Sequence, residues 1–461
     1  MNQMEQIPFD PADAGAALAQ LPRTAAAFAL YGANAKAEPY IGRTPNLRGR
    51  LERLLQPSAR HPRRLQLAGR VRRIEWRCTG SEFESLLLQF ELLQGVYGVK
   101  ALERMHLRVP AFVRFLGGNP YPRITVTHRP SQREVDWAYG PFPSRAAAER
   151  FADEMLKLFL LRRCTDDLNP DPAFPGCVYS EMKMCLAPCY KGCSDERYAE
   201  ESTAVERFLA TRGESRLVVL RAERDQASAN LEFESAAELH AQVQKVESVR
   251  ALAAELVRPL SELRAVVLQE SANSEEVAVF LFDRGSLRGP AVFSTTGMRI
   301  QNEQSGSTSL FAQPMAIEPV LEEAGAQGLG TEGLGTESEG LGIRDQGSEI
   351  RGPRSAIKDQ GPGTERFGIK GQLAQARPGR GVLEARMEAV LAELAQPTAL
   401  PNAVVRQGHM ALLKRWYYRP EARRAGEIFF PDADGRWPLK PILRGAGRVA
   451  GKMIAGPGQQ K

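Results

Sequence analysis

Four cysteines that lie within 26 residues have the clearest capacity for chemistry in this sequence. Cys164, Cys177, Cys185 and Cys189 follow the spacing C-x12-C-x7-C-x3-C, in a segment interrupted by several prolines. Four thiolates suit either a tetrahedral zinc ion or an iron–sulfur cluster. Zinc sites usually contain C-x2-C pairs, which this segment lacks, so the spacing favours an iron–sulfur cluster and leaves zinc as the alternative. Buried free thiols without a metal are the simplest competing interpretation.

The other two cysteines, Cys78 and Cys193, are expected to take no part in such a site. The 461-residue chain has no run of about 18 apolar residues, and its N-terminus lacks the basic and apolar pattern of a secretory signal. We therefore expect a cytoplasmic protein that does not contact a membrane. In that compartment thiols stay reduced, so disulfides are not expected.

The elements expected to position these cysteines make an α+β multidomain chain. A small α/β unit is predicted over residues 21–105, with strands at 26–31 and 38–41 and helices at 48–55 and 81–94. A linker domain over residues 106–200 is predicted to hold the cysteines, after a strand at 123–127 and a helix at about 144–161.

The second half of the chain is predicted to be helical first and then irregular. Residues 201–257 favour a hairpin of two helices, at about 204–228 and 232–256, because apolar residues recur at three- and four-residue spacing. Residues 258–302 favour a short β-hairpin region, with strands at 264–268, 277–282 and 291–294. Repeats such as GLGTE indicate a low-complexity linker over 303–380, and a small basic domain is expected over 381–461.

The cysteine segment resembles that of the UvrC family of excinucleases, which act in bacterial DNA repair. The similarity runs from Leu161-Arg-Arg-Cys164 to Cys185-Leu-Ala-Pro-Cys189, and upstream phrases such as Tyr121-Pro-Arg-Ile-Thr-Val agree with it. The resemblance implies that Cys164, Cys177, Cys185 and Cys189 hold a [4Fe–4S] cluster. It also implies a DNA-repair nuclease of the cytoplasm, and it extends over roughly residues 20–300.

The run from Tyr40 to Arg50, Tyr-Ile-Gly-Arg-Thr-Pro-Asn-Leu-Arg-Gly-Arg, is similar to the second half of the GIY-YIG nuclease motif. The resemblance implies that the Tyr40 phenol helps to activate water and that Arg50 stabilises charge at the phosphate. Two expected residues are replaced: Phe28 stands for the first tyrosine and Gln89 for the glutamate that binds Mg2+ or Mn2+. Phenylalanine has no hydroxyl and glutamine has no charge, so we expect this unit to be impaired as a nuclease.

The phrase Asn230-Leu-Glu-Phe-Glu resembles the UVR motif, through which proteins of this family dock onto UvrB, their partner in the excinuclease. The resemblance implies a partner-binding face made of Phe233, Ala236, Ala237 and Leu239. An ordinary intramolecular hairpin is the competing interpretation.

Arginine is concentrated near the nuclease-like motif. Eleven arginines face two acids between Arg43 and Arg77, and this density suits contacts with phosphate. We expect Arg43, Arg48 and Arg53 to contact DNA. After Arg299 the sequence has no acidic triad of the kind that a second, RNase H-like nuclease needs. Three functions stay open: a UvrC-like nuclease, a non-catalytic protein that binds DNA and UvrB, and an iron–sulfur structural or redox module.

Overall fold

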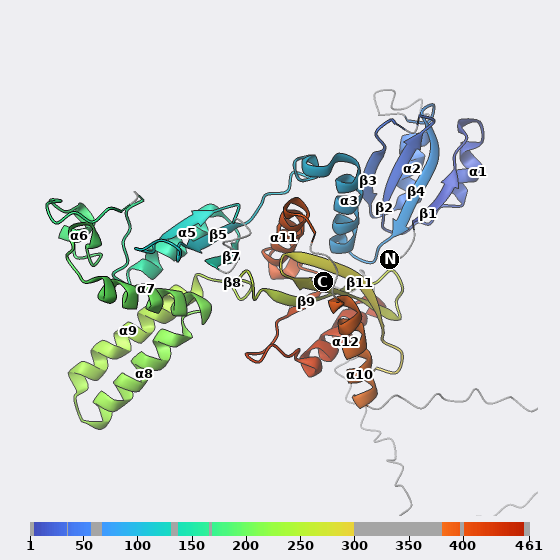
Figure 1. Ribbon diagram of the computed structural model, residues 1–461. Helices are drawn as coiled ribbons and strands as arrows, with labels where there is room; N and C mark the ends of the chain where they lie inside the picture. Colours follow the sequence, from blue (N-terminus) through green and yellow to red (C-terminus); the bar gives the residue numbers. More distant parts are fainter. Residues whose placement is uncertain are drawn as a thin grey trace, which may run out of the picture. The chain divides into compact units, whose positions relative to one another are not determined.

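The computed structural model describes residues 4–34, 36–56, 67–130, 137–165, 168–298, 380–396 and 401–455. The low-complexity segment predicted over 303–380 lies outside these residues, apart from its last position. The described residues form three antiparallel sheets of four strands each, with helices packed against them (Figure 1). In the described part of the chain, no helix combines the length and apolar character needed to cross a membrane.

The first sheet has the strand order β1-β4-β2-β3. Its strands are β1 (Glu5–Pro8), β2 (Ala26–Gly32), β3 (Tyr40–Thr44) and β4 (Val71–Cys78), and its helices are α1 (Ala14–Ala19), α2 (Leu47–Leu55) and α3 (Glu82–Tyr97). The side chain of Asn46 accepts a hydrogen bond from the backbone N–H of Gly49, and so caps the start of α2. The predicted strands at 26–31 and 38–41 and the helix at 48–55 are confirmed, although β3 starts two residues later than expected.

Strand β4 lies inside the arginine-rich stretch that the sequence indicated only as a basic surface. Val71, Ile74 and Trp76 are buried against α1 and α2, while Arg72 and Arg73 are exposed. The apolar positions are few and unevenly spaced, so the high charge of this stretch concealed a central strand.

The second sheet has the order β6-β5-β7-β8 and is covered by helices α5 and α7. Its elements are β5 (Ala111–Phe115), β6 (Ile124–Thr127), β7 (Ala138–Phe142), α5 (Arg145–Leu156), α7 (Asp195–Ala210) and β8 (Arg258–Pro259). Aromatic rings fill its core, with Tyr139 stacked on Phe151 at a centroid distance of 5.8 Å. The predicted strand at 123–127 and the start of the helix at 144 are confirmed; the helix ends five residues before position 161.

The helix predicted at 204–228 is wrong as a single element. The chain instead forms α7, then α8 (Glu214–Ala229) and α9 (Phe233–Ala251). Arg212 and Gly213 have φ angles of 54° and 84°, and this left-handed turn ends α7. A Cβ at position 213 would lie 2.8 Å from Cγ of Arg250, so glycine also permits the close approach of α9.

The third sheet joins two segments that were predicted to belong to separate domains. Its order is β11-β10-β9-β12, in which β9 (Arg264–Glu270), β10 (Glu276–Asp283) and β11 (Ser286–Ser294) pair with the distant β12 (Glu427–Phe429). The expected separation of a β-hairpin region over 258–302 from a domain over 381–461 therefore does not match the structure. The physical reason is that β9 and β10 are apolar on both faces and need a cover on each side.

The two faces of this sheet pack against different helices (Figure 1). Side chains such as Val266, Leu268 and Val279 pack against α10 (Arg380–Ala395) and α12 (Leu439–Ala455). The alternate residues, among them Val267 and Phe280, pack against α3 and α11 (Ala403–Tyr417). Successive side chains along each strand thus point to opposite faces of the sheet and pack in two separate cores.

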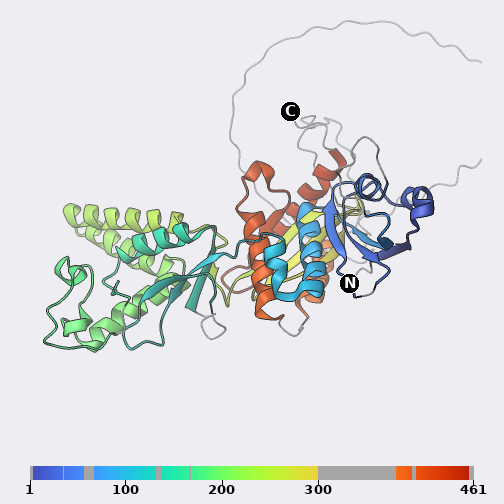
Figure 2. The same cartoon turned by 90° about the horizontal axis from the view of Figure 1, so that it is seen from above.

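Helices α3 and α11 lie side by side, as Figure 2 shows. Gly408 of α11 faces the ring of Phe90 so closely that a Cβ there would overlap the ring. The neighbouring His409 is buried, and its Nδ1 accepts a hydrogen bond of 3.1 Å from the backbone N–H of Leu287. Burial lowers the pKa of His409 to about 4.

This buried imidazole predicts a stability loss in mild acid. His409 stays neutral in the folded protein down to about pH 4, whereas an unfolded histidine takes up a proton near pH 6.5. Its contribution to stability is therefore complete above about pH 6.5 and is lost as the pH falls toward 4. Between pH 7 and pH 5 the wild type should lose about 2 kcal/mol more unfolding free energy than His409→Gln. Urea titrations followed by tryptophan fluorescence measure this, and equal losses in both proteins would refute it.

Candidate functional site

The cysteine segment forms an irregular loop between α5 and α7. Its described residues include the short helix α6 (Val178–Glu181) and a 3-10 helix at Pro188–Tyr190. The backbone turns sharply at Lys183, Ala187 and Lys191, whose φ angles are 53°, 54° and 58°. The hydroxyl of Ser180 bonds to the backbone of Cys177, accepting from its N–H at 2.9 Å and donating to its carbonyl at 2.6 Å. Left-handed turns at non-glycine residues cost energy, so this path requires support from the loop's contacts.

The four predicted ligand thiols affect one another electrostatically. Burial raises the pKa of Cys185, and the charges of Cys177, Cys189 and Cys164 raise it further. The pKa of Cys189 is raised by burial and by two of the same thiols. Within the described ranges, however, no three His, Cys, Asp or Glu side chains are arranged to hold a metal ion.

The other two cysteines have different surroundings. Burial and the neighbouring Asp195 raise the pKa of Cys193. Cys78 is in β4 and accepts a hydrogen bond of 3.4 Å from the hydroxyl of Thr24.

Tyr40, Arg50 and Phe28, from the nuclease-like motif, come together in the structure. Arg50 Nη2 donates a hydrogen bond of 3.3 Å to the Tyr40 hydroxyl, and the Phe28 and Tyr40 rings lie 6.1 Å apart. The pairing of β2 with β3 places Phe28 directly opposite Gly42. Phe28 is fully buried, and a Cβ at position 42 would lie 2.9 Å from Cζ of its ring. This ring therefore serves as core packing and offers no polar atom to a substrate.

Gln89 lies on α3 and is half-buried. Among the described residues, no hydrogen bond links its side chain to Tyr40 or Arg50. Glu84, on the same helix, is buried, and burial raises the pKa of its carboxyl, which accepts a 2.9 Å hydrogen bond from the N–H of Gly80. Neither residue supplies a free carboxylate beside Tyr40.

The three arginines predicted to contact DNA have different roles in the fold. Arg43 pairs with Glu82 at 3.2 Å, and Glu82 also binds Arg419 of the C-terminal segment at 2.7 and 3.0 Å. Arg48 donates to the backbone carbonyls of Leu21 and Ala19, at the end of α1. Arg53 donates to the carbonyl of Gly49.

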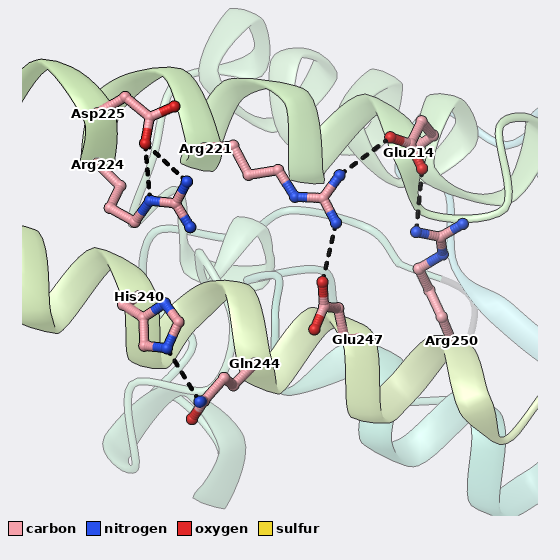
Figure 3. Close-up of polar contacts among 8 residues, drawn as sticks. All are labelled: Glu214, Arg221, Arg224, Asp225, His240, Gln244, Glu247 and Arg250. Atoms are coloured by element: carbon pink, nitrogen blue, oxygen red, sulfur yellow. Dashed lines mark hydrogen bonds and ion pairs between the residues drawn. The ribbon is translucent and has the colours of Figure 1, made fainter. Parts of the chain in front are cut away.

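Helices α8 and α9 form an antiparallel hairpin with an apolar seam and a polar rim. The seam buries Leu217, Leu220, Ala227, Val243, Val246 and Val249. On the rim, Arg221 bridges Glu214 at 3.5 Å and Glu247 at 2.8 Å, and Arg250 binds Glu214 at 3.0 Å (Figure 3). Exposed pairs of this kind contribute little stability each, so the seam holds the helices and the rim sets their register.

The predicted partner-binding face divides into two parts. Phe233 and Ala237 are exposed, whereas Ala236 and Leu239 are half-buried, and Leu239 packs against the protein's own core. The most exposed apolar residue of the hairpin, Leu231, was not predicted. It lies in the turn with a φ of 63° and is 71% exposed, beside Phe233 at 67%. An apolar residue in a tight turn was the signal available in the sequence.

The comparisons with known proteins match the centre of the chain. Residues 112–208 match the family described as UvrC/Cho excinuclease, middle domain, and residues 214–249 match the UvrB/uvrC motif. The UvrABC system protein C of Alcanivorax borkumensis is 30% identical over 211 residues, which cover 46% of this chain and 34% of the relative. That of Pseudomonas aeruginosa is 31% identical over 234 residues, covering 50% and 38%. No solved structure matches.

The resemblance to the UvrC family is thus confirmed for the middle domain and the UVR motif. The chain spans only about a third of the length of these relatives. Both matched segments coincide with folded units: the sheet with its cysteine loop, and the hairpin of α8 and α9.

The contact between Phe28 and Gly42 makes a testable pair. Gly42→Ala should lower the unfolding free energy by roughly 1–3 kcal/mol, because the new methyl group meets a buried ring. In a Phe28→Leu background the same substitution should cost clearly less, since the ring is gone. Denaturant titrations of the four proteins in this cycle measure the coupling. An equal cost of Gly42→Ala in both backgrounds would contradict the assignment.

Proposed function

Because residues 112–249 carry the middle domain and the UVR motif of the UvrC family, we propose that this chain is a UvrC-like component of nucleotide excision repair. In this proposal it binds damaged DNA together with UvrB. The observation that carries it is the order of the two matched units, with an exposed apolar tip on the second. That tip is the kind of surface that a partner covers.

The proposed contact with UvrB is the tip of the hairpin. Leu231 and Phe233 are two of the most exposed large apolar side chains among the described residues, and they lie two positions apart. Burying one such side chain contributes about 1.5–3 kcal/mol, and aromatic anchors often dominate an interface. Ala237 extends this surface along α9, while Ala236 and Leu239 support it from the inner face.

We propose further that the N-terminal unit has lost most or all of its incision activity. Tyr40 and Arg50 keep the hydrogen bond expected between a phenol and a guanidinium at a phosphate. Phe28 and Gln89, however, replace the second phenol and the carboxylate that would hold Mg2+ or Mn2+. A neutral amide lacks the charge that attracts a divalent cation from its hydration shell. The alternative is a nuclease that makes one incision with this altered site.

Contacts with DNA are proposed for the arginines of this unit. Arg43 and Arg53 are partly exposed or exposed, and each has donors beyond the single contact described for it. Arg48 uses its donors on the carbonyls at the end of α1, so its part is to position that surface.

For the cysteine loop we propose a [4Fe–4S] cluster, with zinc as the alternative, held by Cys164, Cys177, Cys185 and Cys189. The donor set suits such a group in kind: burial and the charges of neighbouring thiols raise the pKa of Cys185 and Cys189, and a cation that bound them as thiolates would offset this cost. The cluster would close an irregular loop that has little regular structure. An iron–sulfur structural or redox module is therefore the second alternative function.

The experiment that tests the main proposal uses a lesion-bearing duplex preloaded with UvrA and UvrB, the other two proteins of the excinuclease. We expect the wild type to associate with the loaded complex and to leave the DNA uncut, with magnesium or manganese present. Phe233→Asp should weaken association at least tenfold, whereas the control Val382→Ser, an exposed apolar residue on α10, should not. Equal association by both variants would refute docking through the tip.

The same assay decides between the catalytic and the non-catalytic proposals. Incision by the wild type that is lost in Arg50→Ala would show that the altered site still cuts. Absence of incision by wild type, with incision restored by the double substitution Phe28→Tyr and Gln89→Glu, would identify the two replaced residues as the cause.

The cluster proposal has its own test. Cys185→Ser should lose iron, acid-labile sulfide and visible absorbance in anaerobically purified protein, and should lose solubility with them. Cys193→Ser, the matched control, should retain all four properties because Cys193 lies outside the thiol group. Zinc in place of iron in the wild type would select the alternative metal, and an unchanged metal content in Cys185→Ser would contradict both.

A further inference from the structure

A second basic surface lies away from the nuclease-like motif. It is a groove of about 820 Å³ whose lining includes Lys100, His106, Arg108, Arg129, Glu103 and Gln407. These residues come from three places: the α3–α4 region, where α4 is Ala101–Arg104, the loop after β6, and helix α11. Residues some 300 positions apart in the sequence therefore form one surface.

The cations of this groove are exposed and free of acidic partners. Lys100, Arg108 and Arg129 form no ion pair with any residue that the structure describes. Nearby Arg104 differs, since it pairs with Glu38 at 3.4 Å. Among the lining residues that the structure describes, Glu103 is the one acid. Three cations against one acid leave an excess of positive charge among the described lining residues, and an excess of this kind attracts anions.

Helix α11 adds a further cation at the edge of the groove. Lys414 donates a hydrogen bond of 3.2 Å to the carbonyl of Arg108. Burial lowers the pKa of Lys414, and the positive charge of Arg108 lowers it further. Lys414 thus connects α11 to the backbone of Arg108, and its own side chain is not part of the lining of the groove.

We propose that this groove binds the phosphate backbone of DNA, independently of sequence. Duplex DNA presents one negative charge per about 1.7 Å of its axis, and clustered Lys and Arg side chains neutralise it with release of counterions. The groove is open to solvent and has no deep aromatic box, which suits a backbone rather than a single small anion. The inference rests on the proposed function as a DNA-binding protein, and it assigns DNA contact to a surface outside the nuclease-like motif.

The test compares two triple variants that each remove three positive charges. The groove variant carries Lys100→Gln, Arg108→Gln and Arg129→Gln. The control carries Arg145→Gln, Lys157→Gln and Arg197→Gln, which are exposed and paired with acids of their own helices. Fluorescence anisotropy with an undamaged 30-bp duplex, from 50 to 200 mM salt, gives affinity and salt dependence.

The groove variant should bind at least tenfold more weakly, and the slope of log K against log salt should fall by about 3, near 1 per lost phosphate contact. The control variant should keep the wild-type slope. Glu103→Gln removes the acid of the lining and should tighten DNA binding. This variant still tests the proposal if the triple variant fails to fold.

The outcomes separate the two proposals. A wild type that does not bind DNA overturns both this inference and the DNA-binding part of the proposed function. A wild type that binds, with equal slopes in the groove and control variants or no tightening in Glu103→Gln, overturns the groove alone. If the groove variant is unfolded, Glu103→Gln decides the question, since unchanged affinity there refutes the inference.

Discussion

The burial of β9 and β10 on both faces is the constraint from which most of the C-terminal architecture follows. Successive side chains such as Val266 and Val267 point to opposite sides and enter different cores. Neither face can be left to water, because together they carry a continuous apolar surface. The chain satisfies this by packing α10 and α12 on one side and α3 and α11 on the other. The N-terminal region thus contributes a helix to a core built mostly from the C-terminal half.

Packing contacts also account for the folding of the N-terminal unit that contains the nuclease-like motif. Its sheet depends on Phe28 and Leu30 packing against α1 and α2, and none of these contacts requires catalysis. Phe28 fills its position with apolar contact alone, and Gly42 leaves room for the ring. These packing contacts hold the sheet together whether or not the unit has any catalytic activity.

Local patterns in the sequence were sufficient for the elements that depend on short-range signals. The strand at residues 26–31, the helix at 48–55 and the interruption between helices at 228–232 were predicted from the sequence. The break at the left-handed turn of Arg212 and Gly213 was missed, and the close approach of Arg250 to Gly213, 37 positions away in the sequence, could not be predicted from local patterns. Likewise, β12 has three residues and exists only by pairing with β9. The role of the four cysteines as metal ligands remains a prediction.

The position of Gly408 has a consequence for thermodynamic linkage. It holds α11 against Phe90, and its neighbour Gln407 belongs to the basic groove. The groove is therefore complete only when α11 is docked, so any ligand that fills it binds the docked state preferentially. Such a ligand stabilises docking by RT ln(1 + [L]/Kd), about 2.7 kcal/mol at a hundredfold excess over Kd. Binding of a ligand in the groove and docking of α11 against Phe90 would then stabilise each other.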